Sequence, residues 1–242
     1  PTASALAATW NPDLAREMGE ALGLEARSLG VDVLLGPGLN IKRSPLCGRN
    51  FEYLSEDPIL AGRMAANLVE GIQSTGTAAC PKHFAVNSQE LRRMASNSIV
   101  DERTMREFYL TGFEIVCRAA RPRAIMSSYN LVNGTYAHEN KHLLTDILRT
   151  EWGFDGMVIS DWGGSNSAVG AARAGGSLEM PAPGLAGARQ IVAAVEAGQL
   201  DASDVYARAQ EVLNIASASA GLPAPRPFHS GAHHELATRI AS

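Results

Sequence analysis

The stretch GMVISDW, residues 156–162, places a continuous apolar run directly before a carboxylate and an indole. A short run of this kind is typical of a strand buried on both faces, as in a parallel sheet. In parallel α/β folds, active sites gather where the strands give way to loops. The stretch therefore predicts a strand over 157–161, with Asp161 at its functional end.

Similar apolar runs lie on both sides of this stretch, and amphipathic helical patterns separate them. We expect strands over 32–37, 77–83, 124–128 and 177–181, and helices over 12–30, 57–75, from Asp101 onward, and over 140–153, 191–198 and 204–218. This alternation indicates a parallel sheet with helices outside it. About five strands are too few for a closed barrel of eight. The expected fold class is α/β, a TIM-like (β/α)8 barrel that is incomplete at its N-terminus.

The domain organisation follows from the two ends of the chain. The sequence opens at Pro1 without a methionine, and residues 221–227 are rich in proline and glycine, which is typical of a linker. We expect the missing strands to precede Pro1. We also expect a partial catalytic barrel domain over 1–220, and a linker with the start of a second α/β domain over 221–242.

Composition excludes several classes of function. The 242 residues carry a formal net charge of −4 and contain no basic block, so a nucleic acid is not expected as a partner. No apolar run is long enough to span a bilayer, and no targeting signal is present. Cys47, Cys80 and Cys117 are widely spaced, which predicts buried free thiols rather than a metal site. No membrane partner, metal or cofactor is expected, and localisation is left open, with the cytoplasm favoured.

Polar side chains follow several of the predicted strands. Lys82-His83 follows the strand at 77–81, Tyr129 follows the strand at 124–128, and a loop with Arg49 follows the first strand. Together with Asp161 these groups suit a ligand with many hydroxyls, because cations and imidazole can hydrogen-bond to hydroxyls. A carboxylate among them could attack an anomeric carbon.

Five short motifs carry a resemblance to a known family. They are GRNFE at 48–52, SEDP at 55–58, KHF at 82–84, DERT at 101–104 and SDW at 160–162. In this order they resemble the family 3 glycoside hydrolases of the β-glucosidase type. The resemblance covers the chain from about Trp10 to Pro181, and several ordered motifs are far more specific than a single SDW.

The resemblance implies a retaining mechanism in which Asp161 is the nucleophile. It also implies that seven residues contact the sugar: Arg49, Lys82, His83, Arg93, Met126, Tyr129 and Trp162. The expected function is an exo-acting β-glycosidase, β-glucosidase-like, that hydrolyses terminal non-reducing β-linked sugars through a covalent glycosyl-enzyme.

The chain departs from the family pattern in three places. The early Asp-Gly-Pro segment is absent, and Ser177 stands where relatives usually have an aspartate. The β-glucosidase branch takes its acid/base from a second domain, which we expect beyond Ser242 or on a neighbouring subunit. The β-N-acetylglucosaminidase branch of the family instead has a histidine and an aspartate on a barrel loop after its Lys-His-Phe. Here residues 85–89 read AVNSQ and contain no histidine, which favours the β-glucosidase branch.

Structural interpretations of the same residues stay open. Asp161 could cap a helix, and Arg49 could be a structural ion-pair partner of Glu52 or Asp57. Glu52 and Glu179 are expected to be structural. Met126 and Tyr129 could simply pack in the core. Either Arg93 or its neighbour Arg92 could face the site. Two other functions are also open, namely a sugar-binding barrel without activity and an aldolase or lyase that uses Lys82.

Overall fold

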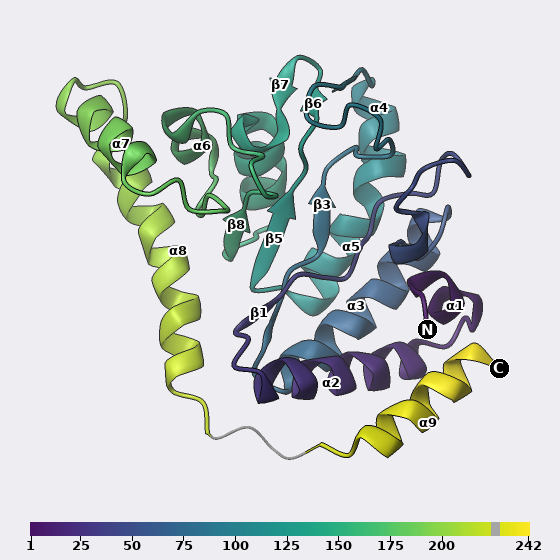
Figure 1. Cartoon of the computed structure of the whole chain (residues 1–242). Helices are drawn as coiled ribbons and strands as arrows, with labels where there is room; N and C mark the ends of the chain where they lie inside the picture. The colour runs from purple at the N-terminus through teal and green to yellow at the C-terminus, as the bar shows by residue number, and fades with distance from the viewer. Residues whose placement is uncertain (224–227) are drawn as a thin grey trace.

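An arc of parallel strands forms the centre of the computed structural model, which describes residues 1–223 and 228–242 (Figure 1). The strands are β1 (Val33–Leu34), β2 (Ala78–Ala79), β3 (Lys82–Phe84), β5 (Ala124–Ser127) and β8 (Met157–Ile159). β1 pairs with β2, β3 with β5 and β5 with β8, all in parallel. Single parallel bridges from Gly38 to Lys82 and from Ile159 to Leu178 extend the order. Spatial order therefore follows chain order, as expected for a TIM-like barrel.

Helices surround this arc (Figure 1). They are α1 (Ala3–Ala8), α2 (Pro12–Ser28), α3 (Pro58–Ser74), α4 (Glu102–Thr104), α5 (Thr111–Ala120), α6 (Ala168–Ala174), α7 (Ala186–Glu196), α8 (Ala202–Ala220) and α9 (Ser230–Ala241). Wider helical turns at Met105–Leu110 and His142–Glu151 complete the layer. The predicted alternation of strands and helices in an α/β barrel is confirmed.

The predicted helix starts depend on side-chain caps. Asn11 Oδ1 accepts the backbone N–H groups of Asp13 and Leu14 at 3.0 and 3.3 Å. Asp57 Oδ1 accepts the N–H groups of Ile59 and Leu60 at 2.7 and 3.1 Å. Each cap precedes a proline at the first helical position, where the missing N–H is not needed. These two helices, α2 and α3, begin where the sequence predicts.

Two glycines let α2 and α3 approach closely. A Cβ atom on Gly71 would lie 2.1 Å from the carbonyl oxygen of Arg16, and one on Gly19 would lie 2.2 Å from that of Leu68. No side chain fits at either position. The backbones of α2 and α3 are therefore in direct contact, which fixes the position of one helix against the other.

Apolar residues pack on both faces of the strands. On the outer side, the ring of Phe84 meets Phe113 and Trp152 edge to face, at 5.2 and 5.9 Å between centroids. On the inner side, a second cluster contains Cys80, Ala124, Met126, Met157 and Ile159. The strands are thus buried on both faces, as their unbroken apolar runs predict.

A buried polar cluster joins α8 to the strands at the position of Ser177. The Ser177 hydroxyl accepts the N–H of Val158 at 2.9 Å and contacts the Glu211 carboxylate. Glu211 also pairs with Arg149 and Arg208, each at 2.9 Å. The serine therefore lies in the packing between strand and helix, and not beside Asp161.

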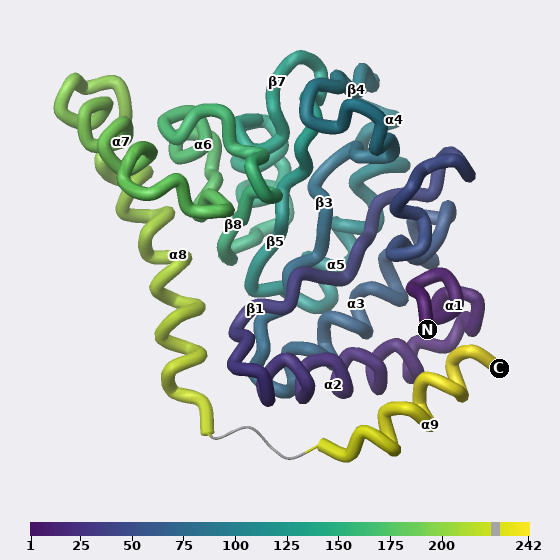
Figure 2. Tube along the Cα trace, viewed as in Figure 1, coloured from purple at the N-terminus to yellow at the C-terminus, as the bar shows by residue number. Residues whose placement is uncertain are grey.

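The C-terminal helix α9 packs against α1 and α2 (Figure 2). Ile240 is buried there, and Arg239 pairs with Glu17. The predicted linker at 221–227 includes residues 224–227, which lie outside the described residues. The assignment of 221–242 to a linker and a second domain stays a prediction.

The three cysteines are free thiols, but their burial differs from the expectation. Cys80 and Cys117 are buried, whereas Cys47 is only half-buried because it lies in the loop before the turn at Asn50–Glu52. Over the described residues, the helices are too short or too polar to cross a membrane.

Candidate active site

Asp161 lies at the carboxyl end of β8 with its two carboxylate oxygens in different environments. Oδ1 accepts the backbone N–H of Trp162 at 2.8 Å. Oδ2 is buried and has no hydrogen-bond partner among the residues that the structure describes. A tight turn follows, because Gly164 N–H donates to the Asp161 carbonyl and Gly163 adopts a φ of +78°. One oxygen is therefore held by the turn and the other is free to react.

His83 faces the free oxygen of this carboxylate. Its Nε2 lies 3.4 Å from Asp161 Oδ2, and its side chain is 1 % exposed. Burial, together with the positive charges of Arg49, Lys82 and Arg93, lowers the pKa of His83 to about 2. The imidazole is therefore neutral at physiological pH.

Glu52 links the two cations that the sequence assigns to sugar binding. Its Oε1 bonds to Arg49 Nε, and its Oε2 lies 3.3 Å from Lys82 Nζ. Although burial acts in the opposite direction, the Arg49 hydrogen bond and the Lys82 charge hold the pKa of Glu52 below its usual value. The three side chains form one network whose carboxylate is ionised.

Arg93, Tyr129 and Trp162 form the other side of the site. The Arg93 guanidinium lies over the Tyr129 ring, 4.5 Å from its centroid, and Tyr129 donates its hydroxyl to the Trp162 carbonyl at 3.0 Å. Arg92 points into solvent, so Arg93 is the arginine on this side. Burial and the charge of Asp161 raise the pKa of Tyr129. The Trp162 side chain is 43 % exposed and forms an open aromatic surface beside Asp161.

Met126 differs from the other predicted site residues. It pairs with Lys82 and Ile159 across the strands, but its side chain is 2 % exposed and belongs to the inner apolar cluster. The structure thus places the Met126 side chain in the inner apolar cluster and not among the polar side chains of the site. Its contact with a sugar stays a prediction.

Sequence reasoning missed two residues at the site and gave a third no functional role. Glu52 was expected to be structural, yet it orients both cations. Tyr53 and Asn40 both contact His83 and received no prediction. Tyr53 directly follows the GRNFE motif, so its place in the sequence was a readable signal. Nothing in the sequence around Asn40 indicates its role.

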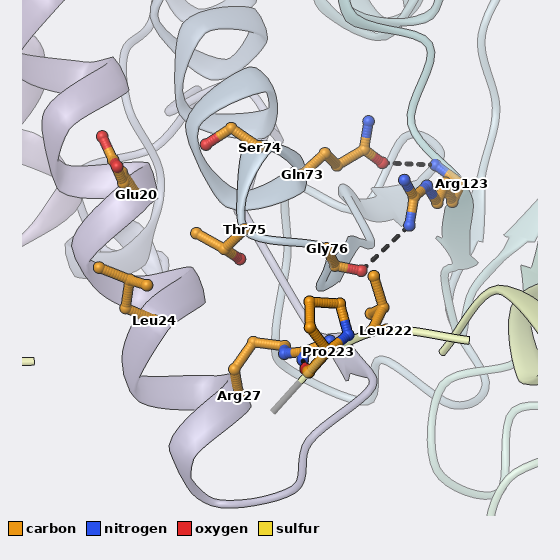
Figure 3. A pocket seen from close by; sticks show the side chains of 10 residues that line it. All are labelled: Glu20, Leu24, Arg27, Gln73, Ser74, Thr75, Gly76, Arg123, Leu222 and Pro223. Atoms are coloured by element: carbon orange, nitrogen blue, oxygen red, sulfur yellow. Dashed lines mark hydrogen bonds between the residues drawn. The ribbon is translucent and has the colours of Figure 1, made fainter. Parts of the chain in front are cut away.

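The other end of the strands carries a separate cavity of about 350 Å³ (Figure 3). Arg123 lines this cavity. The Arg123 backbone N–H donates to the Gln73 side-chain oxygen at 2.8 Å, and the Arg123 guanidinium donates to the Gly76 carbonyl at 3.0 Å. Gly76 precedes β2 and Arg123 precedes β5, whereas Asp161 follows β8. The cavity therefore lies away from the predicted site and contains none of its residues.

The chemistry of the site follows from its donor set. Arg49, Lys82 and Arg93 can hydrogen-bond to hydroxyls, and Asp161 Oδ2 is a carboxylate oxygen without a hydrogen-bond partner in residues 1–223 and 228–242. Over the described ranges, no group of three or more His, Cys, Asp or Glu residues could hold a metal ion. The arrangement suits a neutral polyhydroxylated ligand that sits against Trp162 with one carbon near Asp161 Oδ2.

Comparison with known proteins supports a family assignment. The chain is 46 % identical to thermostable beta-glucosidase B of Acetivibrio thermocellus over 243 residues, and 44 % identical to an exo-alpha-(1->6)-L-arabinopyranosidase of Bifidobacterium longum over 244 residues. Each alignment covers 100 % of this chain and 32 % of the relative, so the chain spans about a third of their length.

Solved structures agree with this assignment. Beta-glucosidase 3B of Thermotoga neapolitana in complex with glucose superposes with a TM-score of 0.95 at 41 % identity, over 99 % of this chain and 35 % of that one. The family described as "Glycosyl hydrolase family 3 N terminal domain" matches residues 1–215. This chain therefore belongs to glycoside hydrolase family 3, and it matches the N-terminal domain of that family.

Proposed function

We propose that this chain is the catalytic barrel of a retaining, exo-acting β-glycosidase of the β-glucosidase type. The observation that carries the proposal is the asymmetry of Asp161, in which Oδ1 accepts the Trp162 N–H and the buried Oδ2 has no hydrogen-bond partner within the described part of the chain. A structural helix cap would use its oxygens on backbone N–H groups of the helix. Here the contact with Trp162 N–H orients the carboxylate, and Oδ2 is left available to attack a carbon.

The surrounding groups fit the remaining parts of a retaining mechanism. Asp161 Oδ2 attacks the anomeric carbon while the bond to the aglycone oxygen breaks and the acid/base protonates that oxygen, and water then hydrolyses the glycosyl-enzyme with the deprotonated acid/base as the base. Arg49, Lys82 and Arg93 hold the sugar hydroxyls, and Trp162 supports one face of the ring. These contacts orient the sugar so that the anomeric carbon meets Oδ2.

The acid/base must come from a different carboxyl group, about 5–5.5 Å from the nucleophile in retaining enzymes. Glu52 is tied to Arg49 and Lys82, and Glu90 is tied to Arg93 at 2.9 Å. Although burial acts in the opposite direction, the Arg49 and Lys82 contacts hold the pKa of Glu52 below its usual value and make it a poor proton donor, and Glu90 is engaged in its ion pair. We therefore assign the acid/base to a second domain of the same protein or to a neighbouring subunit.

The names of the relatives guide the choice of substrate class. Several relatives are named beta-glucosidases, and one is named for an L-arabinopyranoside. We propose terminal non-reducing β-linked sugars as substrates. A barrel that binds sugar without activity and a lysine-dependent lyase are the competing possibilities, but the pairing of Lys82 with Glu52 gives the lyase no support.

Covalent labelling tests the proposal. An activated 2-deoxy-2-fluoro glycoside should form a stable ester with Asp161 in the protein that carries this chain, and peptide mass mapping should find it on the peptide with residues 157–162. Asp101, Asp155 and Glu179 serve as internal controls and should stay unlabelled. A label on any of these would reject Asp161 as the nucleophile. Reduction by borohydride of a substrate adduct on Lys82 would support the lyase instead.

A further inference from the structure

The backbone of His83 is clamped by the side chain of Asn40. The His83 N–H donates to Asn40 Oδ1 at 2.7 Å, and Asn40 Nδ2 donates to the His83 carbonyl at 2.8 Å. Both residues are buried, at 4 % and 1 % exposed. Two opposed hydrogen bonds from one amide fix the position of the His83 peptide, which belongs to β3.

The ring of His83 is held by Tyr53 on the side away from Asp161. The Tyr53 hydroxyl lies 3.2 Å from His83 Nδ1, and the two rings meet edge to face with centroids 6.2 Å apart. Tyr53 is fully buried, and this burial raises the pKa of its hydroxyl. The hydroxyl therefore keeps its proton and can donate it to Nδ1.

Asn40 offers the competing partner for the same ring nitrogen, but a weaker one. Its Oδ1 lies 3.4 Å from Nδ1 and already accepts the His83 N–H at 2.7 Å. The Tyr53 hydroxyl is closer to Nδ1 and has no other hydrogen-bond partner among the described residues. The Tyr53 hydroxyl can donate to Nδ1, and the Asp161 carboxylate that faces Nε2 can only accept, so both contacts fit a neutral ring with its single proton on Nε2.

We propose that Tyr53 and Asn40 are positioning residues that fix His83 as a neutral imidazole with its proton on Nε2, facing the free oxygen of Asp161. Nε2 lies 3.4 Å from Asp161 Oδ2. In this tautomer an N–H dipole points at the carboxylate. The reverse tautomer would place a lone pair against it and repel the charge of the nucleophile. The catalytic part of this proposal rests on the proposed function, whereas the tautomer does not.

Nitrogen NMR of histidine-labelled protein tests the tautomer directly. In the wild type, His83 should show an imine-type Nδ1 and an amine-type Nε2, with the signals assigned by their loss in His83→Gln. Tyr53→Phe removes only the hydroxyl, so the proton should move toward Nδ1, where Asn40 Oδ1 can accept it. Tyr206→Phe changes an exposed tyrosine on α8 and should leave the His83 signals unchanged.

Two results would overturn the proposal. One is a wild-type His83 with its proton on Nδ1, a result that needs no variant to fold. The other is an unchanged tautomer in a folded Tyr53→Phe protein. In activity assays, Tyr53→Phe should lower kcat roughly fivefold to tenfold with little change in KM, because the substrate contacts remain. Failure of the fluorosugar to label Asp161 would reject the proposed function and leave the tautomer result standing.

Discussion

The ammonium group of Lys82 lies 3.3 Å from the carboxylate of Glu52, and both side chains are largely buried. The same carboxylate also holds Arg49. A long lysine side chain has many rotamers, so an unpaired Lys82 would lose conformational entropy each time it bound a ligand. Glu52 therefore orders both cations before any ligand binds.

Glu52→Gln should show how much the ordering of Lys82 and Arg49 contributes to ligand binding, apart from the chemical step. The glutamine keeps the shape but loses the charge, so Lys82 and Arg49 should become less ordered. We expect kcat/KM to fall roughly 10-fold to 100-fold, mainly through a higher KM. Glu107→Gln is the matched control, because Glu107 pairs with Arg103 on the exposed surface. Steady-state kinetics with an aryl glycoside make the comparison, and equal effects in both variants would exclude a role for Glu52.

Asp161→Asn should abolish turnover and preserve binding. The amide has the shape of the carboxylate but cannot attack the anomeric carbon, so kcat should fall by roughly 10⁴-fold or more. Arg49, Lys82 and Arg93 remain to hold the hydroxyls, so the glucose affinity measured by calorimetry should change little. Asp155→Asn, at an exposed carboxylate, should keep normal kcat. Near-normal turnover in Asp161→Asn would remove the proposed mechanism.

The sequence predicts the central strands well because each combines a buried apolar run with a polar end. It predicts their lengths less well. The strand expected over 77–83 divides into β2 and β3, separated by Cys80 and Pro81, and Pro81 has no N–H to donate to a ladder. The hairpin of β6 (Leu131–Val132) and β7 (Thr135–Tyr136) was not predicted, although its Asn133-Gly134 turn is a readable signal.

For the site, the motifs predict which groups approach one another but not what holds them. His83 lies in β3 and Asp161 follows β8, with β5 between the two strands, and parallel pairing brings their side chains together. Asn40 could not be predicted, because its role depends on backbone atoms of a residue far away in the chain. The same is true of the Arg149–Glu211 pair, which forms only after α8 returns to the strands.

Gly71→Ala should destabilise the fold although alanine favours helices. In an exposed helix this change would stabilise by about 0.5–1 kcal/mol. Here the new methyl group would lie 2.1 Å from the Arg16 carbonyl, so α2 and α3 must separate. We expect a net loss of about 1–3 kcal/mol. Urea unfolding measures it, with Gly221→Ala as the control, because a Cβ there has its nearest neighbour at 3.7 Å. A neutral Gly71→Ala would show that the helix contact is looser than described.

Stability should fall in mild acid because two buried histidines are held neutral. Burial lowers the pKa of His138 to about 4, and its Nδ1 lies 2.8 Å from the Ser127 hydroxyl. His83 is depressed further in the same direction. An unfolded histidine titrates near pH 6.5, so between pH 6.5 and 4 the unfolded chain binds more protons than the folded one. The free energy of unfolding therefore decreases as the pH falls through this window.

At pH 5 each of these histidines should reduce the free energy of unfolding by on the order of 2 kcal/mol relative to pH 7.5. Urea titrations at the two pH values measure this difference. His138→Gln keeps a polar side chain but cannot titrate, so its loss between pH 7.5 and pH 5 should be smaller than that of the wild type by about the contribution of one histidine. His234→Gln, at an exposed position on α9, should keep the wild-type loss. If His138→Gln lost as much stability as the wild type, the acid sensitivity would have to come from groups other than His138.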